Sequence, residues 1–284
     1  MYTFRFNPVF DQWVMLGGAV AAPHQLSDAH ILTKDGSKKR EFLAAVYPRQ
    51  PFLLEPPDTH KNHHDSLLYA EHPAVGEYEL LLHKGKKKFF NWEAAEWMSW
   101  LDLVQQRLLQ AQHNPYIHYV NLTFHSSALE SIEGYQRVGD LIATSHPIAG
   151  MVGVLDREIA QKLEKKEHLF TIWSGDQGRI YIPSAPLQEK ELWYIPAEYQ
   201  ASFERVESEA CAELAEVLAH VFNRLHAEYP DEAYVLRLYS QVVGKQEEAT
   251  WWIQIFKEES QLGGALLVHS LPEAFVQQLK HLLG

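Results

Sequence analysis

The chain has 284 residues, of which 46% are hydrophobic and 22% are charged, and its formal net charge is −12. This composition is typical of a folded globular protein and excludes an intrinsically disordered one. The acidic balance argues against a nucleic-acid partner, because neutralising phosphates requires clustered Lys and Arg.

Membrane and secretion signals are not evident in the sequence. No apolar run reaches the roughly 18–20 residues that a transmembrane helix needs, so we expect no membrane partner. The N-terminus does not combine a basic region with an apolar one, as a secretion signal would. The single cysteine, Cys211, allows neither an internal disulfide nor a four-cysteine zinc site. We therefore expect a cytoplasmic protein that uses no cofactor.

The first half of the chain combines apolar strands with one long amphipathic helix. Asn91 is expected to cap this helix, whose apolar side chains recur at helical spacing from Trp97 to Ala111. Asn114 and Pro115 end it. Strands are expected at residues 12–16, 42–47, 76–83, 116–124 and 136–143.

The second half repeats this order. Ser208 is expected to cap a second long helix, and a capping box from Ser270 to Glu273 opens a last helix that runs to residue 283. Strands are expected at residues 189–195, 234–239 and 250–256. Glu79 and Glu191 mark matching strands at a spacing close to that of Val138 and Trp252. The sequence thus predicts an α+β fold made of two related halves, 1–150 and 151–284, each an antiparallel sheet with a long packed helix.

The strands that close the two halves carry the polar positions of most interest. Because side chains alternate along a strand, every second residue should look into one shared space. These residues are Gln136, Val138 and Asp140 in the first half, and Thr250, Trp252 and Gln254 in the second.

Five blocks of the sequence, taken in order, carry a family resemblance. They are residues 5–14 (RFNPVFDQWV), 76–82 (GEYELLL), 189–196 (EKELWYIP), 251–256 (WWIQIF) and 263–268 (GGALLV). In this order and spacing the chain resembles the galactose-1-phosphate uridylyltransferase family of the histidine-triad superfamily. The resemblance implies two fused histidine-triad-like halves and a chemistry of nucleotidyl transfer.

The resemblance also indicates what this chain lacks. In the family, a histidine in an H-x-H-x-Q strand attacks the α-phosphorus and carries the nucleotidyl group. Here the nucleophile position falls on Val138, or on Gln136 if the strand is placed without a gap from Ser131. Neither side chain can form that intermediate. Asp140 takes the place of the phosphate-contacting glutamine, and among the family's phosphate contacts only Ser131 is matched.

The leading interpretation is a relative that has lost covalent nucleotidyl transfer. It would bind a nucleotide or sugar phosphate, or act as a homodimeric partner. The expected ligand cleft consists of Ser131, Gln136, Val138, Asp140, Thr250, Trp252 and Gln254.

Two other interpretations remain open, so the sequence does not decide whether the protein is an enzyme. In the first, the protein is an active nucleotidyltransferase or hydrolase of altered chemistry that acts on a nucleotide or nucleotide sugar. His125 or His146 would pair with Asp140 as a general base for hydrolysis, although both histidines also fit structural roles at strand ends. In the second, the many tryptophans form an interaction surface, although a place in the core explains them more simply.

A metal site is not predicted. His63, His64 and Asp65 could ligate a metal ion, but their polar neighbours favour a solvated loop.

Overall fold

The computed structural model describes residues 2–7, 12–17, 30–31, 42–46, 71–73, 76–84, 89–115, 117–126, 131–132, 135–144, 155–156, 161–162, 165, 169–200, 202–241, 249–258 and 272–283. His63, His64, Asp65 and His146 lie outside these residues. No helix among the described residues is long and apolar enough to span a membrane.

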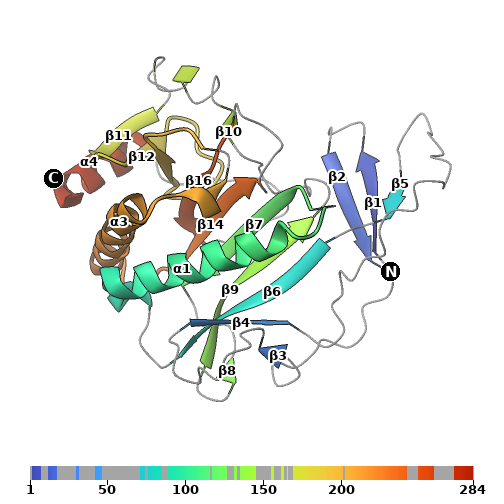
Figure 1. Ribbon diagram of the computed structural model, residues 1–284. Coiled ribbons are helices and arrows are strands. Elements are labelled where there is room, and N and C mark those ends of the chain that lie inside the picture. Colours follow the sequence, from blue (N-terminus) through green and yellow to red (C-terminus); the bar gives the residue numbers. More distant parts are fainter. Residues whose placement is uncertain are drawn as a thin grey trace.

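One antiparallel sheet of eleven strands forms the centre of the described structure (Figure 1). Its order is β11-β12-β13-β16-β14-β7-β9-β6-β4-β3, and the short β8 pairs with β9. The strands are β3 (His30–Ile31), β4 (Phe42–Val46), β6 (Gly76–Lys84), β7 (Tyr119–His125), β8 (Ser131–Ile132), β9 (Tyr135–Thr144), β11 (Leu169–Ser174), β12 (Gly178–Pro183), β13 (Leu192–Pro196), β14 (Tyr234–Gln241) and β16 (Trp252–Lys257).

Two smaller sheets accompany the large one. The first contains β1 (Tyr2–Asn7), β2 (Gln12–Gly17) and β5 (Glu71–Pro73), and the second contains β10 (Leu155–Asp156) and β15 (Ala249–Thr250). The helices are α1 (Ala94–Ala111), α3 (Ser208–Glu228) and α4 (Pro272–Leu283), with short 3₁₀ turns at η2 (Phe89–Asn91) and η3 (Phe203–Arg205).

The strand order is symmetric about the pair formed by β7 and β14. Moving outward, β9, β6 and β4 on one side correspond to β16, β13 and β12 on the other. Each half therefore runs strand, helix, strand, strand along the chain, as the sequence predicts. Thr144 is the last described residue of the first half and Leu155 begins the next described strand, so the boundary at residue 150 stays a prediction.

The long helices α1 and α3 lie on the same face of the sheet (Figure 1). A shift of 114 residues maps all seven buried positions of α1 onto buried positions of α3. Trp97, Trp100 and Leu108, for example, correspond to Cys211, Leu214 and Phe222. Two stripes with the same spacing, facing the same sheet, give each half the same helix-on-sheet core.

The strand register corrects one sequence-based match. Glu79 pairs with Leu141, and Leu192 pairs with Ile255. Leu141 and Ile255 are 114 residues apart, so the position that corresponds to Glu79 is Leu192 and not Glu191. A slip of one residue changes the face of the sheet. Glu79 contacts Arg107 of α1, whereas Glu191 binds residues on the opposite face.

Helix starts and one strand also differ from expectation. Glu93, not Asn91, caps α1, in a capping box with Glu96, and Glu207 precedes α3 in place of Ser208. The expected strand at 250–256 is interrupted at Trp251, whose backbone N–H donates to the Gln200 carbonyl oxygen at 2.7 Å. Before this interruption, β15 pairs with β10 in the small sheet and not with the large one.

Candidate functional site

A β-bulge interrupts β9 at the position where the family resemblance places a nucleophile. On β6, Leu81 pairs with Gly139 and Leu82 pairs with Arg137, so Val138 is the extra residue. Val138 is only 6% exposed and belongs to the apolar core that packs under the helices. The next residue, Gly139, lies so close to β7 that a side chain would not fit: a Cβ there would be 2.3 Å from the Thr123 carbonyl oxygen.

The bulge also changes what Asp140 faces. In an unbroken strand, residues three apart point to opposite faces, but here Arg137 and Asp140 meet. The Arg137 Nη2 donates to both carboxylate oxygens of Asp140, each at 2.8 Å, and Nε donates at 3.0 Å. Gln136 pairs with His83, whose ring contacts Trp92 of the helix-side core, so Gln136 and Val138 share the helix side and Asp140 lies on the opposite face. The expected alternation of Gln136, Val138 and Asp140 into one space is therefore wrong.

The second half keeps strict alternation. Trp251, Ile253 and Ile255 join the helix-side core, which places Trp252 and Gln254 on the opposite face. The Trp252 ring stacks on Tyr239 at 4.7 Å and meets Trp193 at 5.0 Å in an edge arrangement. Trp252 is 2% exposed, so aromatic packing fills the position that would hold a histidine in the family pattern.

Glu191 is the centre of a buried hydrogen-bond network beside Trp252. One carboxylate oxygen accepts from Gln254 Nε2 at 2.6 Å and Trp193 Nε1 at 2.5 Å. The other accepts from the backbone N–H groups of Leu187 at 2.7 Å and Gln188 at 2.9 Å. Four donors balance the burial of this charge, as a buried carboxylate requires.

Both the nitrogen and the oxygen of the Gln254 side-chain amide are hydrogen-bonded within the protein. Its nitrogen donates to Glu191, and its oxygen accepts from the Tyr239 hydroxyl at 2.9 Å. Burial raises the pKa of Tyr239, so the phenol remains a donor near neutral pH. Gln254 thus serves a structural network here.

The remaining cleft residues lie at the ends of these strands. Ser131 pairs with Gln136 across β8 and β9, and Gln136 also pairs with His83 of β6. Thr250 is buried, and its hydroxyl donates to the Trp251 carbonyl oxygen at 3.1 Å. The structure therefore does not gather all seven predicted residues on one face, and their role in ligand binding stays a prediction.

His125 lies at the end of β7, where its Nδ1 is 3.4 Å from Glu258 Oε1. In the described part of the chain, no group of three or more His, Cys, Asp or Glu residues could hold a metal ion. The tryptophans expected to form an interaction surface are Trp92, Trp97, Trp100, Trp193, Trp251 and Trp252, and all but Trp193 are at most 2% exposed. The aromatic-surface interpretation is thus wrong for these five residues: Trp92, Trp97, Trp100, Trp251 and Trp252.

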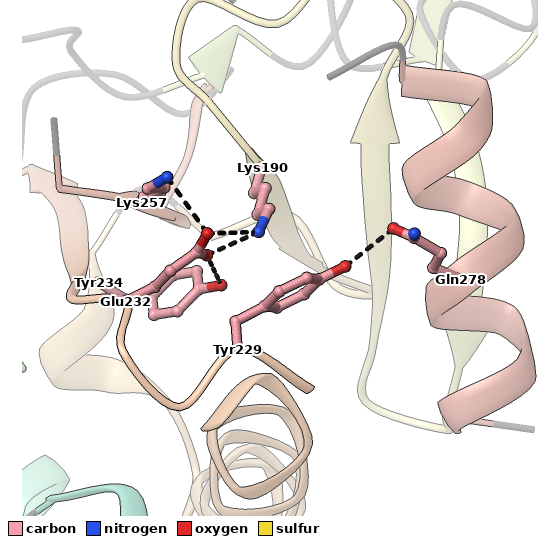
Figure 2. Close-up of polar contacts among 6 residues, drawn as sticks. All are labelled: Lys190, Tyr229, Glu232, Tyr234, Lys257 and Gln278. Atoms are coloured by element: carbon pink, nitrogen blue, oxygen red, sulfur yellow. Dashed lines mark hydrogen bonds and ion pairs between the residues drawn. The ribbon is translucent and has the colours of Figure 1, made fainter. Parts of the chain in front are cut away.

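A second polar cluster joins the C-terminal helix to the sheet (Figure 2). Glu232 accepts from Lys190 Nζ at 2.6 and 2.7 Å and from the Tyr234 hydroxyl at 2.8 Å. Lys190 Nζ also lies 3.2 Å from the centroid of the Tyr229 ring, and the Tyr229 hydroxyl donates to Gln278 of α4 at 2.8 Å. Sequence patterns could not reveal this cluster, because its members come from separate elements.

Comparison with known proteins identifies the fold. No family model matches the sequence, and no curated protein matches it. Solved structures do match over almost the whole chain. A uridylyltransferase gives a TM-score of 0.69 at 11% identity, covering 100% of this chain and 98% of its own. A GALT-like protein from Arabidopsis thaliana gives 0.67 at 13% identity, covering 98% of both chains.

A third match is an ADP-glucose phosphorylase from Arabidopsis thaliana, solved with bound ADP-glucose. It gives a TM-score of 0.67 at 14% identity and covers 98% of both chains. The chain has the two-half α+β fold of these proteins. This confirms the fold that the sequence resemblance implied.

Proposed function

We propose that this protein binds a nucleotide or a sugar phosphate without forming a covalent nucleotidyl intermediate. The main support is that Val138, a buried aliphatic residue, stands where the resemblance places the nucleophile. A valine has no lone pair with which to attack phosphorus. The alternative placement puts Gln136 there, and a neutral amide is no better a nucleophile.

The proposed binding function is supported by the fold and by local charge. Among proteins of this fold, the ADP-glucose phosphorylase was solved with a nucleotide sugar. Asp140 alone would repel a phosphate, but its bidentate pair with Arg137 neutralises the carboxylate. The polar side chains of Ser131 and Gln136, which pair on neighbouring strands, are the ligand contacts that we propose.

Intact-protein mass spectrometry and thermal unfolding test the two parts separately. We expect ADP-glucose or UDP-glucose to raise the unfolding temperature without adding mass to the chain. A ligand at 100 times its Kd stabilises the fold by about 2.7 kcal/mol. A nucleotidyl adduct would refute the loss of covalent transfer, and the absence of any shift with either nucleotide sugar would refute binding.

A matched pair of glutamine variants locates the ligand. Gln136→Ala should remove most of the thermal shift, whereas Gln106→Ala, at an exposed position of α1, should leave it unchanged. Equal shifts in both variants would place the ligand away from β9.

Hydrolysis by altered chemistry is the alternative function, and the same incubations test it. Released nucleoside monophosphate that disappears in a His125→Ala/His146→Ala double variant would favour it. Because Asp140, the carboxylate that would pair with a histidine, is bonded by Arg137, we expect no such release.

We also propose that the chain forms a homodimer. Light scattering should then give twice the monomer mass of 32.7 kDa. A monomer at high concentration would refute this part.

A further inference from the structure

A cavity lies between helix α3 and the hairpin formed by β11 and β12, on the helix side of the sheet. Its volume is about 360 Å³, within the range of small-molecule sites. Trp173, Ile180, Val217 and Val221 give it an apolar lining. Trp252 and Gln254 lie on the opposite face, so this cavity is separate from the predicted cleft.

One wall of the cavity is held rigidly. The Glu213 carboxylate accepts the backbone N–H groups of Asp176 at 3.1 Å and Gln177 at 2.9 Å, which ties the hairpin turn to α3. At Gly175 a Cβ would lie 2.3 Å from the Trp173 ring and 2.5 Å from a Glu213 oxygen. Glycine therefore lets the indole and the carboxylate converge, and such a pre-formed wall lowers the entropy lost on binding.

The polar part of the lining is acidic. It consists of Glu213, Glu216 and His220, and none of the seven lining residues is Lys or Arg. Burial and the nearby Arg224 charge lower the pKa of His220, so its imidazole is neutral at pH 7. Each Glu213 oxygen accepts one backbone N–H and keeps a second lone pair for a further donor. Glu216 is exposed at the rim.

We propose that this cavity binds an organic cation, a primary amine or guanidinium group with a small apolar body. An aromatic ring beside two carboxylates is the arrangement that attracts such a cation, through its charge and through the ring quadrupole. Val217, Val221 and Ile180 accommodate the apolar body. A metal ion fits less well, because the described residues supply no group of three suitable ligands.

Calorimetric titration of the full chain with phenethylamine tests the proposal. Two probes with the same ring but a different charge serve as controls, 2-phenylethanol and 3-phenylpropionate. Phenethylamine should bind at least tenfold more tightly than the alcohol, and the propionate should not bind. Equal binding of all three, or no binding of the amine, would overturn the proposal.

Two glutamate variants on α3 then locate the site. Glu216→Gln should weaken phenethylamine binding about five- to tenfold, whereas Glu209→Gln, also exposed on α3, should not change it. Val217→Phe should fill the cavity and abolish binding while circular dichroism confirms the fold. An unchanged affinity in both Glu216→Gln and Val217→Phe would refute the location. Nucleotide-sugar binding is measured separately, so its failure would leave this result intact.

Discussion

The ion pair between Glu79 and Arg107 gives the sharpest test of how the two halves are built. Arg107 Nε and Nη2 each donate to one Glu79 oxygen, at 2.7 and 2.6 Å, across the contact of α1 with β6. The Glu79 side chain is only 4% exposed and the Arg107 side chain 15%. The symmetry of the fold places Leu192 and Val221 at the matching positions, so the second half has two apolar residues there.

We expect the single and double variants to differ in sign. Arg107→Leu leaves a buried carboxylate without its partner and should cost about 3–5 kcal/mol of unfolding free energy. Glu79→Leu should cost less, because the long Arg107 side chain can move its charge toward solvent. The double variant Glu79→Leu/Arg107→Leu should be neutral or more stable than wild type by roughly 1–4 kcal/mol.

Denaturant unfolding followed by circular dichroism measures all three variants. Arg224→Leu, which removes an exposed arginine from α3, is the control and should stay within about 0.5 kcal/mol of wild type. A double variant as unstable as Arg107→Leu would refute the reasoning, since it would show that the apolar pair of the second half cannot be transferred.

Three further substitutions test other parts of the structure by the same assay. Gly139→Ala should cost about 1–3 kcal/mol, because the new methyl group meets the Thr123 carbonyl; an unchanged stability would contradict this. Burial raises the pKa of Glu204. The stability that protonated Glu204 contributes to the fold is therefore present at low pH and is lost as the pH rises through that pKa. Glu204→Gln should therefore exceed wild type in stability near pH 7, with the difference vanishing below about pH 4.5. For Glu232, hydrogen bonds led by Lys190 outweigh burial and lower the pKa, so Glu232→Gln should lose about 1–3 kcal/mol at pH 7 and less as pH falls.

The repeat of strand, helix and strands could be predicted because it depends on periodic apolar residues. The buried stripe of α1 is visible as spacing in the sequence, and so is that of α3. The register was harder to predict. Residue type favours matching Glu79 with Glu191, but an error of one residue in a strand exchanges its two faces.

The candidate site could be located from sequence only in part. The sequence identified β9 and β16, but a bulge at Val138 depends on pairing with β6, which is remote in the chain. The partners of Gln254 are equally remote, since Glu191 lies 63 residues away. The sequence does not predict hairpin β11–β12 or the cavity that it forms with α3, because that segment shows no clear alternation of apolar residues.

Hydrogen bonds within the chain decide at which positions a substitution can test ligand binding. Asp140 and Gln254 correspond across the symmetry axis, and each is already bonded within the chain. Replacing Gln254 by leucine would remove a donor from the buried Glu191, and an unmet buried acceptor costs roughly 1–3 kcal/mol whether or not a ligand exists. A loss of binding in that variant would therefore be ambiguous. Gln136, half-buried on β9, is the position where loss of binding can be separated from loss of fold.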